Sequence, residues 1–258
     1  MSFVTRVLRN DFVSNTLIGI FIRGISFVVP YLLITPYLVR VLGEGQFGLI
    51  SFSIGFVSLF FPLVEYGFIL TAPRDLSLHQ DKPSKVGDIV SNIILVKLFL
   101  SIFSITVASS LIFWESSLAH NAILHFSSLL LVVGQALVPA WLYQGLGQLK
   151  KFALYTLLVN LCYLVFVVSF IRAPADYLSV TLGQGVIWIS LYSVALLQIV
   201  YPLRKYIRFS WKGAVGELKK GFSIFLTNFF FVLLRVAMGK KMKNARFFCS
   251  TRQVSRHY

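Results

Sequence analysis

Residues 88–114 read DIVSNIILVKLFLSIFSITVASSLIFW, a stretch in which Lys97 is the only charged residue after Asp88. A helix rises about 1.5 Å per residue, so a bilayer core about 30 Å thick needs about 20 apolar residues to be crossed. In hydrocarbon the backbone must satisfy its own hydrogen bonds, which favours a helix. The stretch therefore predicts a transmembrane helix.

The same apolar pattern recurs along the chain, and short loops that carry most of the cations separate the runs. Every run reaches the length of a membrane span except the last, which is borderline. The pattern predicts an all-α, multi-pass membrane helix bundle, with one six-helix lobe over 1–220 and a partial seventh helix over 221–238. We expect a basic cytoplasmic loop at 202–220 and a basic tail at 239–258. The apolar runs are Phe12–Val39, Phe47–Leu70, Asp88–Trp114, Ala122–Leu146, Phe152–Ile171, Tyr177–Tyr201 and Gly221–Met238.

The composition excludes several functional classes. Apolar residues make up 57% of the 258 residues and charged residues 13%, whereas about a quarter of a soluble domain is charged. The net charge of +15 suggests nucleic acid, but the cations flank the apolar runs as membrane anchors do, so we expect no nucleic-acid partner. Cys162 and Cys249 lack metal-ligand spacing, and the histidines form no H-E-x-x-H motif. We therefore expect no enzyme, no metal and no cofactor.

The distribution of cations between the loops predicts the orientation in the membrane. With a cytoplasmic N-terminus, 13 cations lie in inside segments and only Arg40 and Arg172 lie outside. Loop charge bias sets the orientation of membrane proteins, so we expect the N-terminus in the cytoplasm. The densest inside segment, Arg204–Lys220, predicts either an interfacial helix in the headgroup plane or a solvated basic loop.

Arg23 and Lys97 lie deep within apolar runs. Arg23 is about ten residues, or about 15 Å, from either end of its run, and an intramembrane Arg costs at least about 2.5 kcal/mol. Such residues commonly face a cavity, so Arg23 and Lys97 predict a cationic cavity for an anionic substrate. Glu65 or Asp88 would act as counter-charge or coupling site, although both are expected near the cytoplasmic surface, in solvent. The alternative is a buried pair such as Arg23–Glu65 that only holds helices together, with Lys97 snorkelling to the surface.

Proline and glycine interrupt several of the runs. Each proline removes a backbone donor and kinks its helix, and broken helices are common in transporters. Glycines permit tight turns or a close approach of helices. The prolines inside the runs are Pro30, Pro36, Pro62 and Pro139, and glycine-rich stretches lie at 43–48, 145–147 and 183–185.

Residues 30–52 read PYLLITPYLVRVLGEGQFGLISF, in which a proline-broken helix leads into a glycine-rich turn. This hairpin resembles the first hairpin of Wzx-type O-antigen and polysaccharide flippases, in the multidrug/oligosaccharidyl-lipid/polysaccharide exporter superfamily. The segments EYGF at 65–68 and PAWLYQGL at 139–146 are similar to the same family. The resemblance covers roughly residues 10–220. The motif positions to which it assigns a structural role are Pro30, Pro36, Arg40, Gly43, Gly48, Gly67, Pro139, Trp141 and Gly145.

The resemblance implies a carrier in the bacterial inner membrane that moves an undecaprenyl-pyrophosphate-linked oligosaccharide from the cytoplasmic to the periplasmic leaflet. Family members usually have two six-helix lobes around a central cavity, and one lobe rocks against the other in alternating access. Arg23, and less directly Lys97, match cationic positions that would bind the pyrophosphate. The implied partners are the lipid-linked oligosaccharide, membrane lipids, a polysaccharide polymerase and a chain-length regulator.

Three alternatives stay open on the sequence. A multidrug or small-cation antiporter of the same superfamily would favour an acidic cavity over a cationic one. A membrane enzyme such as a polysaccharide polymerase would need a sizeable polar loop, and none of the loops provides one. The third alternative is a non-functional membrane fragment.

The basic tail breaks the charge pattern of the rest of the chain. If the seventh run crosses the membrane, the six cations after residue 239 lie outside. Either this run does not cross, or the residues after about Leu226, where the family resemblance stops, come from a frameshift. A truncated or frameshifted flippase accounts for both the tail and the missing second lobe. It predicts five or six further apolar runs in another reading frame of the DNA beyond codon 226.

Overall fold

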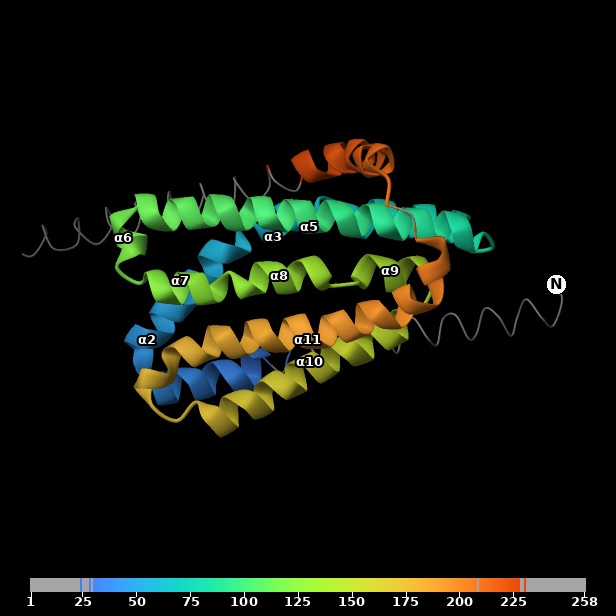
Figure 1. Cartoon of the computed structure of the whole chain (residues 1–258). Coiled ribbons are helices and arrows are strands. Elements are labelled where there is room, and N and C mark those ends of the chain that lie inside the picture. The colour runs from blue at the N-terminus through green and yellow to red at the C-terminus, as the bar shows by residue number, and fades with distance from the viewer. Residues whose placement is uncertain (1–23, 25–27, 29, 208, 228–229, 231–258) are drawn as a thin grey trace, which may run out of the picture.

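The computed structural model describes residues 24, 28, 30–207, 209–227 and 230, and these residues form helices joined by short loops (Figure 1). No strand occurs in this described part of the chain. One helix covers residues 211–227, near the end of the described part. The elements before it are η1 (Pro30–Ile34), α2 (Thr35–Ser58), α3 (Phe61–Glu65), α4 (Phe68–Leu78), α5 (Pro83–Trp114), α6 (Ser116–Ala119), α7 (Ala122–Ser128), α8 (Leu130–Leu137), α9 (Ala140–Gly145), α10 (Leu149–Phe170), η2 (Pro174–Asp176), α11 (Tyr177–Leu203) and η3 (Arg204–Tyr206).

Five segments of the described chain are long and apolar enough to cross a membrane. Gly43 divides the first segment into two passes, because its φ of +78° and ψ of +164° interrupt the helix that runs through α2. Glycine suits this position because it adopts positive φ without a steric penalty. The all-α membrane helix bundle predicted from the apolar runs is thus confirmed. The five segments are Leu32–Leu78, Pro83–Trp114, Ala122–Gly145, Leu149–Phe170 and Pro174–Tyr206.

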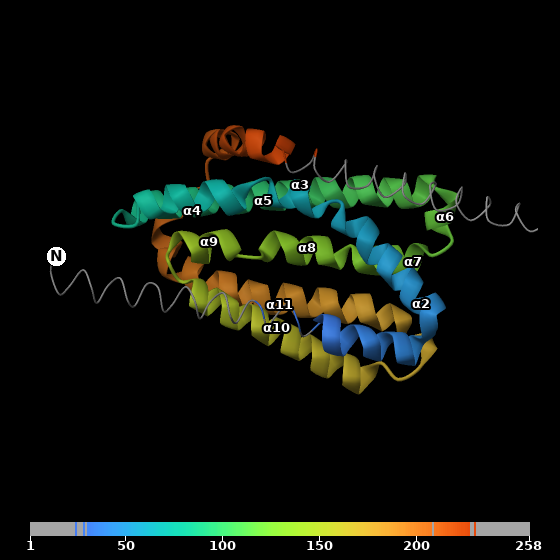
Figure 2. The ribbon, with the colours of Figure 1, turned by 180° about the vertical axis from the view of Figure 1, so that it is seen from behind.

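The long helices lie side by side with their axes roughly aligned. In Figure 1, α5 lies above the row formed by α7, α8 and α9, and α11 and α10 lie below it. Figure 2 shows the opposite face, where α2 crosses obliquely in front of α7 and leads to α3. Buried apolar side chains fill the space between these layers, with one cluster between α4, α5 and α9 and another between α2, α10 and α11.

Two of the predicted prolines mark breaks in the spans. Pro62 lies in the first turn of α3, directly after the helix is interrupted at Leu59 and Phe60. Pro139 lies between α8 and α9, where Val138 has extended backbone angles. A third break, at Tyr66 and Gly67, has two successive residues with positive φ, of 46° and 81°. The second pass is therefore three short helices and not one long helix.

Two predicted boundaries of the spans were wrong. The second run was expected to end at Leu70, but α4 continues to Leu78 with Pro73 inside it. The third run was expected to begin at Asp88, but α5 begins at Pro83. Polar residues in these turns lower the apolar average without ending the helices, so the apolar runs are shorter than the helices that contain them.

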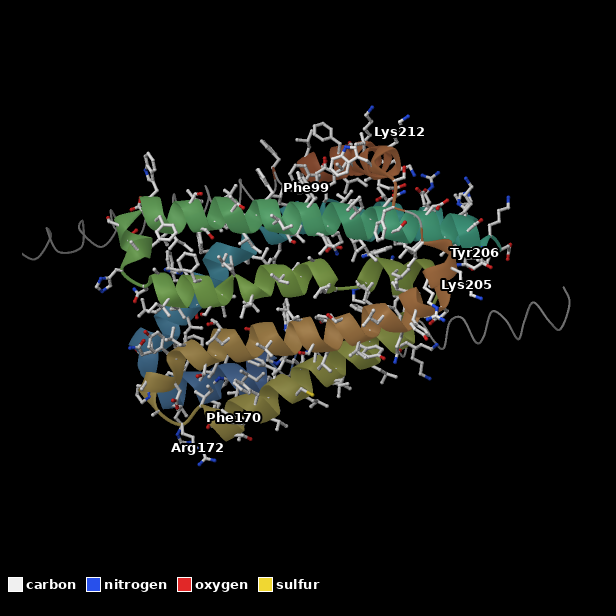
Figure 3. All side chains as sticks on the ribbon, viewed as in Figure 1. Phe99, Phe170, Arg172, Lys205, Tyr206 and Lys212 are labelled. Atoms are coloured by element: carbon white, nitrogen blue, oxygen red, sulfur yellow. The ribbon has the colours of Figure 1, made fainter. Side chains whose placement is uncertain are left out.

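The loops rich in lysine and arginine meet at one end of the bundle. The α4–α5 turn, the α9–α10 turn and η3 all lie there, on the right of Figure 1. Figure 3 shows Lys205 at this end and Arg172 at the other. This geometry agrees with the loop charge bias read from the sequence, and we refer to it as the cation-rich end.

The helix over residues 211–227 packs against α4, α5 and the break between α3 and α4. The backbone N–H of Ser210 donates to Asn92 Oδ1 at 3.2 Å, and Phe225 stacks on Tyr66 with ring centroids 4.7 Å apart. α5 has 32 residues and is about 48 Å long, more than the bilayer core, so Asn92, in its first third, lies toward the membrane surface. Residues 211–220 are helical and not a loop, and the helix runs on into the predicted seventh run, of which 228–229 and 231–238 lie outside the described residues.

An ion-pair cluster holds this helix to α4. Lys220 Nζ donates to Asp75 Oδ2 at 2.7 Å and to Glu217 Oε1 at 2.8 Å. Burial by itself would lower the pKa of Lys220, but the hydrogen bonds and charges of the two carboxylates together raise it. Lys220 is half exposed, so this cluster adds little to stability and mainly fixes the position of the helix against α4.

Gly145 allows α9 to lie directly on α4. A Cβ atom built on Gly145 would lie 2.7 Å from Leu76 Cβ and 3.1 Å from Pro73 Cα. Overpacking of this kind costs about 1–3 kcal/mol, so we expect Gly145→Ala to lower the free energy of unfolding by that amount. Thermal unfolding of the purified protein in detergent measures the effect. The matched control is Gly216→Ala, where a Cβ meets nothing within 4 Å; equal melting of the two variants would contradict the prediction.

Candidate functional site

A buried ion pair lies halfway along α5. Lys97 Nζ donates to Glu65 Oε2 at 3.0 Å, and the exposed fractions of the two side chains are 2% and 17%. Gln135 Nε2 donates to the same carboxylate oxygen at 3.3 Å. Lys97 Nζ also donates to the backbone carbonyl of Val138 at 3.4 Å. The four groups come from α3, α5, α8 and the α8–α9 break, so the cluster joins three spans.

The helix breaks create the acceptors that this lysine uses. In an unbroken helix the N–H of Leu142 would bond to the carbonyl of Val138, but here it donates to Pro139 at 3.0 Å. The Val138 carbonyl is therefore left to Lys97. Glu65 is the last residue of α3, and its Oε1 atom is buried with no hydrogen-bond partner among the described residues. Discontinuous helices with free backbone groups at mid-membrane are typical of transporter sites.

This arrangement corrects the predicted surroundings of two residues, Glu65 and Lys97. Glu65 is not in solvent, because α4 extends the span by eight residues beyond the predicted end and so places Glu65 deeper in the bundle. Lys97 does not snorkel to the surface, because it has a carboxylate partner beside it. Asp88 is half-buried in the second turn of α5 and forms no ion pair with any described residue. Arg23 lies outside the described residues.

A large cavity in the described part of the chain, about 760 Å³, opens between η1, α2, α10 and α11. Its lining combines amide and hydroxyl groups with aromatic rings, and none of the described lining residues is a lysine, an arginine or a carboxylate. Neither Lys97 nor Glu65 reaches it. The polar and aromatic lining residues are Thr35, Ser51, Thr156, Asn160, Gln184, Tyr163, Trp188 and Tyr192.

The sequence reasoning missed a second buried polar cluster. Ser53 Oγ lies 2.9 Å from His125 Nδ1 and 2.8 Å from Ser128 Oγ, which connects α2 to α7. Ser127 Oγ lies 2.6 Å from Thr181 Oγ1, which connects α7 to α11. All five side chains are buried. The sequence signal that could have revealed this cluster is the position of His125 close to Ser127 and Ser128 inside an apolar run.

Most of the family-motif residues occupy turns and helix contacts. Pro30 begins η1, Pro36 lies in the first turn of α2, and Arg40 is exposed three residues before the Gly43 turn. Gly48 is exposed on α2, whereas Trp141 is buried in the core between α4, α5 and α9. The substrate-binding and coupling roles assigned to Arg23, Lys97, Glu65 and Asp88 stay predictions.

Comparison with known proteins gives the family of this chain. The model of the polysaccharide biosynthesis protein family matches residues 8–239. Two curated relatives carry the name "Putative O-antigen transporter". The one from Escherichia coli (strain K12) is 29% identical over 155 residues, which are 60% of this chain and 37% of the relative. The one from Shigella dysenteriae is 24% identical over 220 residues, which are 83% of this chain and 53% of the relative.

The chain thus spans about half the length, or less, of these curated relatives. No solved structure matches it. The family model covers most of the chain, including every motif residue on which the resemblance rested. The chain is a multi-pass membrane protein and belongs to the polysaccharide biosynthesis protein family.

Proposed function

We propose that this chain forms a lobe of a carrier that moves lipid-linked polysaccharide repeat units, O-antigen units among them, from the cytoplasmic to the periplasmic leaflet of the inner membrane. The observation that carries the proposal is the family match over residues 8–239. The names of the two relatives point to the same class of cargo. The proposal includes a polyprenyl-pyrophosphate carrier lipid on the cargo and a cytoplasmic location for the cation-rich end.

The large cavity supports a sugar-bearing cargo. Its volume of about 760 Å³ lies within the range of ligand pockets, and its described lining includes hydroxyl, amide and aromatic side chains. Hydroxyl and amide side chains hydrogen-bond to sugar hydroxyls, and aromatic rings cover the apolar faces of sugar rings. A small-cation antiporter would place carboxylates there, and none of the described lining residues is a carboxylate. We further propose a polysaccharide polymerase and a chain-length regulator as protein partners, because they act on the delivered units.

Complementation tests the proposed function directly. The chain is produced in a bacterium whose own O-antigen transporter gene has been deleted, alone and together with the part of the Escherichia coli relative that lies beyond the match. We expect surface polysaccharide to return in at least one of these arrangements, detected by staining of extracted lipopolysaccharide. A chain that inserts correctly and restores no polysaccharide in either arrangement contradicts the proposal.

We also propose that Arg23 binds the pyrophosphate of the cargo. Arginine forms bidentate, charge-assisted hydrogen bonds to phosphate, and each such bond contributes about 1.5–3 kcal/mol. We therefore expect Arg23→Ala to reduce polysaccharide export by about tenfold or more in the same assay. Arg23→Lys keeps the charge and should retain part of the activity. Normal export by Arg23→Ala, at equal protein level, would remove Arg23 from the mechanism.

A further inference from the structure

Two adjoining cavities begin at the cation-rich end, and their described lining shares no residue with that of the large cavity. The first, about 340 Å³, is enclosed by the ends of α4, α5, α9, α10 and α11, and its polar lining includes Gln80, Gln148, Lys151 and Gln198. The second, about 350 Å³, is a groove between α10 and α11. Lys151 and Gln198 line both, so the two cavities meet at these side chains.

The first cavity has the chemistry of a headgroup site. Lys151, Gln148 and Gln198 make no side-chain hydrogen bond or ion pair to any residue that the structure describes. Gln80 Nε2 donates to the Gly145 carbonyl at 2.7 Å, which holds the wall of the cavity in place. The cavity therefore offers one ammonium group and two amides that have no side-chain partner among the described residues. These groups suit an anionic ligand with additional hydroxyl or ester oxygens.

The second cavity has the chemistry of an acyl-chain groove. Leu154 and Leu158 lie one helical turn apart on α10, and their exposed fractions are 48% and 44%. They follow Lys151 along α10 away from the cation-rich end, toward the middle of the bundle. The groove is thus polar at the membrane surface and apolar below it, which is the order of groups in a lipid.

We infer that these two cavities together bind one anionic phospholipid of the surrounding leaflet, with its phosphate beside Lys151 and an acyl chain along Leu154 and Leu158. The leaflet that faces a cation-rich end is rich in anionic lipid, and each interfacial lysine contributes to its attraction. A headgroup cavity of about 340 Å³ is near the lower limit for ligand pockets. It suits a phosphoglycerol headgroup, and it is too small for a pyrophosphate bearing an oligosaccharide. The site is therefore distinct from the cargo cavity. It rests on the cytoplasmic location proposed above for the cation-rich end, and not on the transport of cargo.

Native mass spectrometry of the purified full chain in detergent tests this site. Phosphatidylglycerol and phosphatidylcholine with the same acyl chains are titrated separately. We expect phosphatidylglycerol to bind at least about fivefold more tightly, the effect of about 1 kcal/mol for an interfacial lysine. Lys151→Glu should remove this preference. Lys82→Glu is the matched control, because Lys82 is exposed at the same end and lines neither cavity, and it should leave the preference intact.

The groove is tested by Leu158→Trp, which fills it at an exposed position and should weaken binding of both lipids by about fivefold or more. Glycerol 3-phosphate, which carries the headgroup chemistry without acyl chains, should not displace the lipid. Equal binding of the two lipids, loss of the preference in Lys82→Glu as well as Lys151→Glu, unchanged binding by Leu158→Trp, or displacement by glycerol 3-phosphate would each overturn the inference.

Discussion

Replacing Lys97 with Met is expected to lower the free energy of unfolding by about 3–5 kcal/mol, the largest stability effect predicted for this chain. Removing one partner of a buried ion pair strands the other charge in a medium that solvates it poorly. Here the stranded group is the Glu65 carboxylate, which is only 17% exposed and would retain, among the described residues, only Gln135 as a hydrogen-bond donor. The Val138 carbonyl would lose its donor as well. Thermal and denaturant unfolding in detergent measure the change.

The double variant Lys97→Met with Glu65→Leu separates the effect of the stranded charge on stability from the effect of altered packing. Replacing both partners by apolar groups removes the stranded charge, so we expect the double variant to be more stable than Lys97→Met alone. The double variant should still be less stable than the natural chain, because the Val138 carbonyl stays without its donor. A double-mutant cycle gives the coupling between the two residues, expected at up to about 3 kcal/mol. Zero coupling would show that the pair does not form.

The same pair shows what the apolar pattern could and could not predict. The depth of Lys97 in its span followed from counting residues along one run. Its partner did not, because Glu65 is 32 positions away in the sequence and the two meet only through the packing of α3 against α5. Glu65 was also placed at the wrong depth, since the helix continues through Pro73 to Leu78, well past the end of the apolar run.

The breaks in the spans were easier to predict than their consequences. Pro62 and Pro139 indicate interruptions because a missing N–H and a ring clash are local properties. That the Val138 carbonyl released near Pro139 would accept a bond from Lys97 depends on a neighbouring helix. The cationic cavity suggested by the sequence stays a prediction, because Arg23 lies outside the described residues, and the described lining of the large cavity is neutral. The relative rotation of the helices decides which residues line a cavity. The apolar runs carry little amphipathic asymmetry, so the sequence does not fix this rotation.

Filling the large cavity should strongly reduce transport without unfolding the protein. Gly55 lies on the cavity wall, and a Cβ atom built there meets nothing within 4 Å. Gly55→Trp would therefore place an indole in the space assigned to the cargo. We expect export in the complementation assay to fall by about tenfold or more, which corresponds to about 1.4 kcal/mol of lost cargo binding. Removing a glycine from a helix also favours the helix, so the protein level should not fall.

The matched control is Gly45→Trp in the same helix. Gly45 also has open space around its Cβ position, but it lies near the Gly43 turn and does not line the cavity. A tryptophan at that end would lie near the membrane surface, where such side chains are favoured. Export by Gly45→Trp at the natural level, together with its loss in Gly55→Trp, would locate the path of the cargo in the cavity. Equal export by both variants would contradict that path and would indicate that the cargo passes along another face of the lobe.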